Sequence, residues 1–347
     1  MAYTNIDDPS AHFQAFTYSG TSNTAASYTF TGNSNMKPDL VWLKQRGYSD
    51  SHYLFDSSRG VEKAIYSNLT NAEAFHNSSL TSFDTNGFSV GLSNVGSGGG
   101  TYATWNFKAN GGTTSSNTAG STTTTVQVNQ DAGFSIVTYL GNGNAANQTL
   151  GHGLGVAPDM IISKRRGAST DWLVYHKSLG VGSIIYLNSN VASSTTNPPY
   201  KDTPTSTVFS TQYEFQASDY WVSYCFAEKQ GYSKFGKYIG NGSTNGPFVY
   251  TGFKPAFIMR KRTDGAGDWA ILDYKRNPTN LADQFLSADA NSAESNYLDI
   301  FSIDILSNGF KFRTSRYESN QSGSTYIYMA FAENPFVTST GIPTTAR

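Results

Sequence analysis

The feature of this chain that most constrains its fold is a repeat that occurs three times. Each copy starts with a tyrosine segment that leads into glycine, continues with a proline-led apolar strand and a second apolar strand, and closes on an aromatic strand. These four segments keep their order and near-constant spacing, and they begin at Tyr18, Pro38, His52 and Tyr102 in the first copy, at Tyr139, Pro158, Asp171 and Trp221 in the second, and at Tyr238, Pro255, Asp268 and Tyr326 in the third. Such a repeat predicts three copies of one fold, and it favours display, assembly or multivalent binding over catalysis.

The composition indicates that the repeated unit is built from β-strands. Charged residues make up only 14% of the 347 residues, yet the mean hydropathy is −0.40, because serine, threonine, asparagine and glycine supply the polarity. Aromatic residues also reach 14%. This mixture of turn formers and strand formers predicts an all-β protein of three tandem antiparallel β-sandwich modules, jelly-roll or lectin-like, with the aromatic last strand in the centre of a sheet. Asn86-Gly87 and Asn308-Gly309 predict tight hairpin turns.

The repeat and the shifts in composition predict where the modules begin and end. Residues 1–12 are too few for a domain and form an arm that either docks or stays loose. A linker rich in serine, threonine and glycine precedes the second module, although the alternation of Thr124, Val126 and Val128 could also pair as an edge strand. A chain cut after Asn110 is expected to leave a soluble, folded module. The predicted segments are 1–12 (arm), 13–110 (module), 111–131 (linker), 132–228 (module), 229–336 (module) and 337–347 (an extended tail).

Charge and hydropathy argue against two classes of partner. The net charge is −1 and the isoelectric point is about 6.5, so the chain has no electrostatic footprint for nucleic acid or an anionic membrane. No apolar run approaches the length of a membrane span. The first residues carry neither the basic nor the apolar region of a signal peptide, so we expect synthesis in the cytoplasm without export by that route.

Motifs for catalysis and cofactors are sparse. The five histidines do not show metal-ligand spacing, and the Gly-Asn-Gly runs at 141–143 and 240–242 lack the residues that complete a phosphate loop, so we expect no cofactor and no metal. A glycan-cleaving enzyme needs two convergent carboxylates. The recurring acid at Asp56 and Asp273 is His176 in the second copy, so we expect no enzyme. A glycosidase stays open as an alternative, because sandwich enzymes collect catalytic groups from distant strands.

One aromatic position invites a sugar-binding interpretation. Trp172 and Trp269 stand at the start of the second apolar strand, next to polar residues, and we take Tyr53 as their counterpart in the first copy. An aromatic residue there could stack on a sugar at the surface. A periodic aromatic residue in an aromatic-rich repeat is more commonly part of the core, and we favour that interpretation.

Several stretches resemble repeat-bearing virion structural proteins of marine tailed phages. The resemblance covers essentially the whole chain and is carried by residues 1–10, 38–44, 55–60, 82–88 and 336–347. The second stretch is a strand beginning Pro38-Asp39-Leu40, and the third is a DSxRG pattern in which Asp56 and Arg59 are the charged members. The resemblance implies a lectin-like β-sandwich module without enzymatic residues. The second and third copies keep only fragments of DSxRG, so any binding by that element would belong to the first copy.

These observations predict a non-enzymatic phage virion surface protein, either a capsid decoration or a tail-accessory or fibre-like component. Its expected partners are other virion proteins, further copies of itself, with a trimer implied by the resemblance, and a cell-surface glycan. The glycan-contact candidates are Tyr53, Asp56, Arg59, Trp172 and Trp269. Two alternatives remain: a glycan-degrading enzyme of the tail-spike type, and a cellular carbohydrate-binding adhesin, which would normally carry an export signal.

Overall fold

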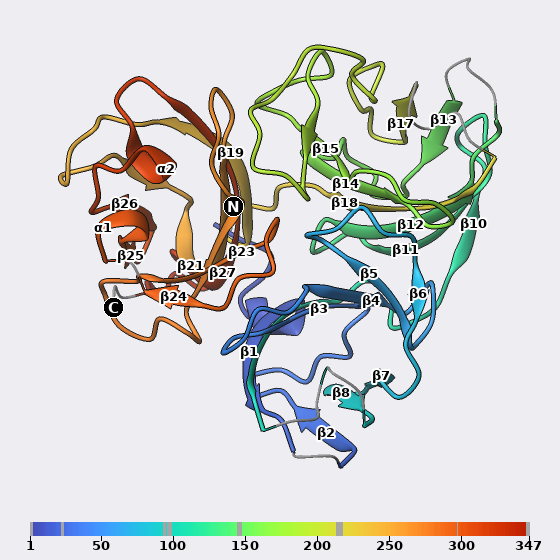
Figure 1. Cartoon of the computed structure of the whole chain (residues 1–347), viewed down its shortest axis with the longest axis horizontal. Coiled ribbons are helices and arrows are strands. Elements are labelled where there is room, and N and C mark those ends of the chain that lie inside the picture. Colours follow the sequence, from blue (N-terminus) through green and yellow to red (C-terminus); the bar gives the residue numbers. More distant parts are fainter. Residues whose placement is uncertain are drawn as a thin grey trace.

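A computed structural model shows an all-β protein with antiparallel sheets, as the composition predicted. It describes residues 3–344 apart from 22–23, 93–94, 96–98, 144–147, 213–217 and 297, so the last three residues of the predicted tail lie outside it. Within these residues no helix is long and apolar enough to span a membrane. Each repeat contributes one large and one small sheet, and the small sheets lie toward the outside of the molecule (Figure 1).

The first repeat forms a six-stranded sheet in the order β1-β9-β3-β4-β5-β6 and a three-stranded sheet in the order β2-β8-β7. The aromatic last strand, β9, lies between β1 and β3, away from the sheet edges. The strands are β1 (Phe13–Ser19), β2 (Ala26–Thr29), β3 (Leu40–Gln45), β4 (Tyr53–Asp56), β5 (Lys63–Tyr66), β6 (Ala74–Phe75), β7 (Leu80–Asp84), β8 (Gly87–Val90) and β9 (Thr101–Phe107).

The second repeat extends its large sheet with strands from the predicted linker. That sheet has seven strands in the order β10-β11-β12-β18-β14-β15-β16, and β13 pairs with β17 in the small sheet. The alternating residues from Thr124 form β11, so the prediction that this stretch pairs as a strand is confirmed, but β10 and not β11 lies at the edge of the sheet. The strands are β10 (Ser115–Asn117), β11 (Thr124–Asn129), β12 (Phe134–Leu140), β13 (Gln148–Gly151), β14 (Met160–Arg165), β15 (Leu173–His176), β16 (Ile185–Tyr186), β17 (Val208–Thr211) and β18 (Tyr220–Phe226).

The third repeat reproduces the order of the first, as β19-β27-β21-β22-β23-β24 with a small sheet β20-β26-β25. It adds two short helices, α1 (Leu298–Phe301) and α2 (Tyr317–Asn320). The strands are β19 (Ser233–Ile239), β20 (Phe248–Tyr250), β21 (Phe253–Arg262), β22 (Ala270–Asp273), β23 (Gln284–Ser287), β24 (Ser295–Asn296), β25 (Ile303–Leu306), β26 (Gly309–Phe312) and β27 (Thr325–Pro335).

The two predicted Asn-Gly hairpin turns are confirmed. Asn86-Gly87 connects β7 to β8, and Asn308-Gly309 connects β25 to β26. Gly87 has a φ of 129°, and a Cβ there would lie 1.9 Å from the carbonyl oxygen of Tyr28 on the paired strand. Only glycine fits both the backbone conformation and the close approach of β2.

Each large sheet is buried on both faces. In β3, Val41 and Leu43 point into a core shared with the small sheet of the same repeat, whereas Leu40 and Trp42 point the other way, into a core to which all three repeats contribute. Neighbouring side chains of a strand point to opposite faces, so a run in which every residue is apolar requires cover on both sides. Figure 1 shows the three large sheets meeting near the centre of the molecule.

The central core is rich in aromatic rings from all three repeats. Phe331 of the third repeat lies 5.0 Å from Phe107 of the first and 6.0 Å from Phe226 of the second, between ring centroids. Phe134 of the second repeat lies 5.5 Å from Phe107. The repeats therefore enclose one common interior in addition to the outer core that each repeat builds from its own residues.

The N-terminal arm is docked. Ile6 belongs to the central core, and the hydroxyl of Thr4 donates a 2.8 Å hydrogen bond to the carbonyl of Gln230 at the start of the third repeat. The hydroxyl of Tyr3 donates to the carbonyl of Gly252 at 2.8 Å. Asp7 accepts a hydrogen bond from the amide of Ser339, so the two ends of the described chain are joined.

Candidate functional site

The five predicted glycan-contact residues are all buried. Their exposed fractions are at most 5%, for Tyr53, Asp56, Arg59, Trp172 and Trp269. Tyr53 packs in the outer core of the first repeat, with its ring 5.2 Å from that of Tyr66. The other four lie where one repeat meets the next. Their role in this structure is to join repeats, and none of them presents a free face to a ligand.

The structure changes the alignment of the tryptophan position. The residue that starts the second apolar strand donates its backbone N–H to the side-chain oxygen of a residue 16 to 20 positions later, and the three pairs are His52 with Asn68, Trp172 with Asn188 and Trp269 with Asp289. The counterpart of the two tryptophans is therefore His52, and Tyr53 is one residue out of register. A shift of one residue places a side chain on the opposite face of the sheet, which explains why Tyr53 lies in a different core.

Both indoles connect their repeat to the preceding one. The Trp172 Nε1 donates to the carbonyl of Tyr66 at 2.7 Å, and the Trp269 Nε1 donates to the carbonyl of Tyr186 at 2.8 Å. His52 occupies the same position in the first repeat. Next to its partner Asn68, the hydroxyl of Ser67 donates to the carbonyl of Ala288 in the third repeat at 2.6 Å. The contacts thus run from second to first, third to second and first to third, and the ring of repeats is closed.

A buried chain of ion pairs joins the first repeat to the second. Asp56 and Arg59 pair with each other, and the hydroxyl of Tyr224 from the second repeat donates to Asp56 Oδ2 at 2.7 Å. Glu73 then bridges Arg59, at 2.9 Å, and Arg166 of the second repeat, also at 2.9 Å. Burial opposes the charged form of Arg59, but Asp56, Tyr224 and Glu73 outweigh it and raise the pKa of this guanidinium.

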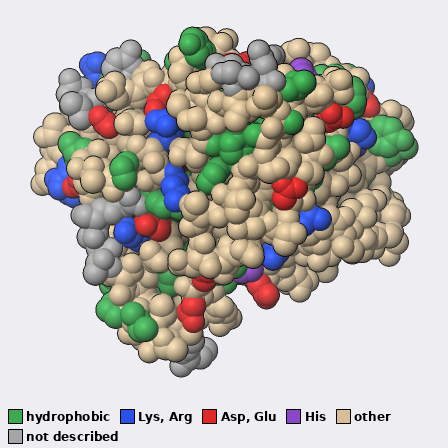
Figure 2. All heavy atoms as spheres, turned by 90° about the horizontal axis from the view of Figure 1, so that it is seen from below, with side chains coloured by type: hydrophobic (Ala, Val, Ile, Leu, Met, Phe, Trp, Pro, Cys, Tyr) green, Lys and Arg blue, Asp and Glu red, His purple; other side chains and the backbone are tan. Residues whose placement is uncertain are grey.

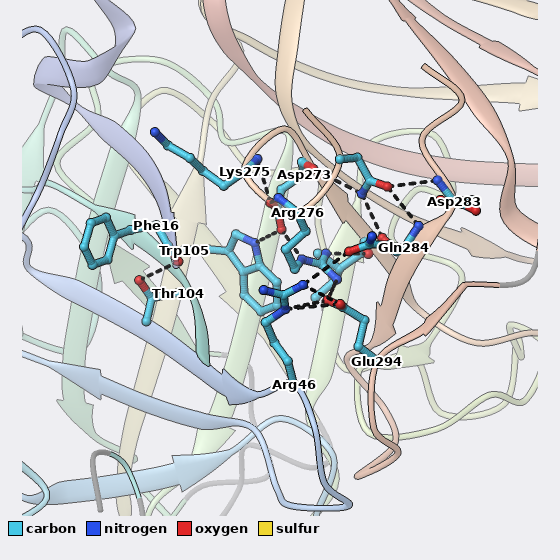
Figure 3. A network of polar contacts seen from close by, with 12 residues as sticks. Phe16, Arg46, Thr104, Trp105, Asp273, Lys275, Arg276, Asp283, Gln284 and Glu294 are labelled. Carbon is cyan, nitrogen blue, oxygen red and sulfur yellow. Dashed lines mark hydrogen bonds and ion pairs between the residues drawn. The ribbon is translucent and has the colours of Figure 1, made fainter. Parts of the chain in front are cut away.

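An equivalent chain of ion pairs joins the third repeat to the first, as Figure 3 shows. Asp273 pairs with Arg276 at 2.6 Å and accepts a 3.0 Å hydrogen bond from Nε1 of Trp105 in the first repeat. Glu294 bridges Arg276, at 3.1 Å, and Arg46 of the first repeat, at 2.6 Å. Arg276 also lies over the indole of Trp105, at 5.6 Å from the ring centroid.

At the third junction, between the second and third repeats, uncharged residues replace all four members of this chain of ion pairs. Ser193 and Thr263 occupy the positions of Glu73 and Arg166. The backbone shows this equivalence, because the amide of Ser193 donates to the carbonyl of Thr263 as the amide of Glu73 donates to that of Arg166. His176 and Leu179 take the positions of the Asp and Arg. Burial lowers the pKa of His176 to about 4, so the ring is neutral at pH 7, and its Nε2–H donates to the carbonyl of Tyr328 in the third repeat at 3.1 Å.

These contacts decide what the recurring acid can do chemically. Asp273 accepts hydrogen bonds from the backbone amides of Lys275 and Arg276 and from the side chains of Arg276 and Trp105. Asp56 accepts from the backbone amide and the side chain of Arg59 and from the hydroxyl of Tyr224. A general acid or base needs a carboxyl group that can reach a substrate proton. Both carboxylates are instead enclosed by the junctions that they hold together.

A buried lysine lies one residue before the end of the proline-led strand in every repeat, at Lys44, Lys164 and Lys261. Each amine donates to backbone carbonyls, for example from Lys164 Nζ to Thr70 O of the first repeat at 2.7 Å and from Lys261 Nζ to Val191 O of the second at 2.8 Å. Burial lowers the pKa of each of these amines to about 8. The basic residues of the repeat therefore hold neighbouring backbone segments in place.

Besides a depression of about 200 Å³ around the junction residues Arg46 and Glu294, three depressions on the described part of the chain are places for a ligand. Two polar grooves, of about 680 and 500 Å³, share His12 and Asp131 at the seam between the arm and the linker strands. Their amide side chains are largely used internally, since Asn129 Nδ2 contacts His12 Nδ1 at 3.0 Å and Gln130 Nε2 donates to Gly153 O at 2.8 Å. Across the described ranges no group of three or more His, Cys, Asp or Glu residues could hold a metal ion.

The third depression is a pocket of about 250 Å³ on the third repeat, next to the second. Aromatic and acidic side chains line it, and they come from β23, α1, α2 and the loop before β22: Asp268, Phe285, Phe301, Tyr317 and Glu318. Sequence reasoning did not find this pocket. One indication was available, because Arg260 stands in the apolar strand where the other copies have Leu43 and Ser163.

Comparison with known proteins gives a family and no described function. No curated protein and no solved structure matches the chain. A family profile matches residues 8–335, a range that includes all three repeats, so the unit of the family is the complete ring and not one copy of the repeat. Because the match covers most of the chain, this protein belongs to the family described as Domain of unknown function (DUF7483).

Proposed function

We propose that this chain is a non-enzymatic structural protein of a phage particle, displayed on the virion surface as a capsid decoration or a tail-accessory component, where it contacts host-surface glycans. The observation that carries the proposal is the position of the charged residues that recur in the repeat. The two ion-pair chains built around a buried arginine, Arg59 or Arg276, lie between repeats. Charges placed there join neighbouring repeats and leave the recurring acids without access to a substrate.

The closed ring of repeats also supports a role in display. A ring with one common core is held by contacts on every side, so its outer sheets and loops are presented in fixed positions. Figure 2 shows Lys, Arg, Asp and Glu side chains interspersed over one face, without a broad field of either sign. Such a surface suits contact with neutral ligands and neighbouring proteins more than with a polyanion.

The ring bears on the expected oligomer as well. Three repeats closed head to tail supply, within one chain, the cyclic arrangement that a trimer would build from three chains. A homo-oligomer, with the trimer as the first expectation, stays part of the proposal. Light scattering coupled to size-exclusion chromatography would measure the mass of the protein in solution. A mass equal to that of one chain would contradict the proposed oligomer.

Cryo-electron microscopy of the particle that encodes this chain tests the proposed function. We expect density for the three-repeat ring at the capsid surface or at the tail, and peptides of the chain in purified, washed particles. Density on the capsid would assign a decoration role, and density at the tail would assign host recognition. A protein confined to the soluble lysate and missing from purified particles would refute the virion proposal and favour the glycan-degrading or adhesin alternatives.

A further inference from the structure

The pocket on the third repeat is built by one buried arginine. Arg260 comes from β21 in the middle of the large sheet and is fully buried. Its Nη1 donates to the carbonyl of Glu318 and its Nη2 to the hydroxyl of Ser319, each at 2.6 Å, so it holds α2. Its guanidinium also lies 5.0 Å from the ring centroid of Phe301 at the end of α1. One side chain thereby fixes both helical walls of the pocket, which lie side by side in Figure 1.

The wall formed by α2 presents an aromatic ring beside a carboxylate. Tyr317 lines the pocket and is 52% exposed. A hydrogen bond with Glu318 raises the pKa of Tyr317. The Oε2 of Glu318 is shielded from solvent and has no hydrogen-bond partner among the described residues. Most buried polar atoms in native proteins have a hydrogen-bond partner, and a hydroxyl of a ligand in the pocket would supply the donor that this oxygen lacks.

The charges around the pocket are of both signs. Asp268 and Glu318 are the acidic groups of the lining, and Asp268 also accepts a hydrogen bond from Ser287 at 3.1 Å. Behind the lining lie two cations, Arg260 and Lys261, and Lys261 interacts electrostatically with Asp268. A free amine would be repelled by the cations and an anion by the carboxylates. This combination favours a neutral ligand that offers hydroxyl donors.

The size of the pocket limits the ligand to one ring. A volume of about 250 Å³ equals the share of roughly eight liquid water molecules. We propose that this pocket binds a single neutral, hydroxyl-bearing sugar ring, with Tyr317 stacking on its apolar face and Glu318 and Asp268 accepting its hydroxyl protons. The inference rests on the proposed contact with glycans and names both the site and the class of sugar.

Saturation-transfer NMR on the full-length protein tests the site. The probes are four neutral sugars (glucose, galactose, mannose and N-acetylglucosamine), each compared with choline as a cation and glucuronate as an anion. We expect saturation of at least one neutral sugar and none of the charged probes. In the Tyr317→Ala variant the affinity for that sugar falls at least tenfold, a factor that corresponds to about 1.4 kcal/mol. Glu318→Gln, which keeps the shape of the side chain, weakens it to a smaller degree.

Tyr220→Ala is the matched control, because Tyr220 is 60% exposed on the second repeat and lies outside the pocket. It should leave binding unchanged, and near-UV circular dichroism should be native for all three variants. Saturation of choline or glucuronate alone, of no probe, or of a sugar in a manner insensitive to Tyr317→Ala would overturn the inference. Each of these results leaves the microscopy test of the virion role unaffected, so the two proposals can fail separately.

Discussion

At the start of the second apolar strand, each repeat needs one side-chain oxygen to accept a backbone N–H. Asn68 and Asn188 supply it as amides, and Asn188 uses its Nδ2–H to donate to Asp171 at 2.7 Å. The third repeat has Asp289 facing Asp268, a pair of carboxyl groups in place of an amide and a carboxylate. Burial, with Asp268 as the second cause, raises the pKa of Asp289 to about 7.

We therefore expect Asp289→Asn to stabilise the protein above pH 7. The pKa of Asp289 is higher in the folded than in the unfolded state, so the wild type loses stability as the pH rises from about 4 through 7. The variant has no such loss. Because the pKa rises from 3.8 to about 7 on folding, the difference should reach about 4 kcal/mol at pH 8 and nearly vanish at pH 4. Urea unfolding at the two pH values measures it.

The matched control reverses the substitution in the second repeat. Asn188→Asp places a carboxyl group beside Asp171, so it should lower the urea midpoint at pH 8 more than at pH 4. Equal midpoints of Asp289→Asn and the wild type at pH 8 would show that Asp289 is not held in the unfavourable ionised form.

At the scale of elements, the junctions between repeats show two solutions to one problem. Two junctions carry the complete Asp-Arg-Glu-Arg chain, and the third has none of its four members. A buried ion pair tolerates replacement as a set much better than the loss of one partner, which leaves an uncompensated charge in the interior. The three junctions agree with this expectation, since each has either all four members of the ion-pair chain or none of them.

Arg276→Leu alone should lower the free energy of unfolding by about 3–5 kcal/mol, because Asp273 and Glu294 lose their buried partner. Transplanting the uncharged set (Arg46→Thr, Asp273→His, Arg276→Leu and Glu294→Ser) should recover at least half of that loss. Denaturant midpoints of the two variants make the comparison. A quadruple variant less stable than the single one would show that the four positions do not act as a unit.

The sequence predicted the strands and the turns better than the junctions. Apolar runs, Asn-Gly pairs and the repeat are local patterns, and they identified β3, β7, β8 and the interior position of the aromatic strand. The partner of Asp56 is Tyr224, in another repeat, and no local pattern reports such a contact. One clue was present in Leu40–Leu43, where the absence of alternation indicates a strand covered on both faces. For the pocket, the clue was Arg260 in an otherwise apolar strand.

At the scale of the whole molecule, the central core makes the three repeats depend on one another. Leu40, Trp42 and Trp105 of the first repeat are all buried there, against rings such as Phe257 of the third. Removing two repeats would expose this entire inner face while leaving the outer core intact. An exposed apolar face of that kind leads to unfolding or association.

The structure therefore argues against a folded first module after truncation at Asn110. We expect residues 1–110 alone to be insoluble or aggregated, and also to lack Gln230, the anchor of the arm. Co-expression with residues 111–347 should restore a soluble complex, because every junction can then form between the two fragments. Size-exclusion chromatography with light scattering distinguishes the cases. A monomeric fragment 1–110 with a cooperative thermal transition would show that the outer core alone maintains the repeat, and that the central core joins modules that are already folded.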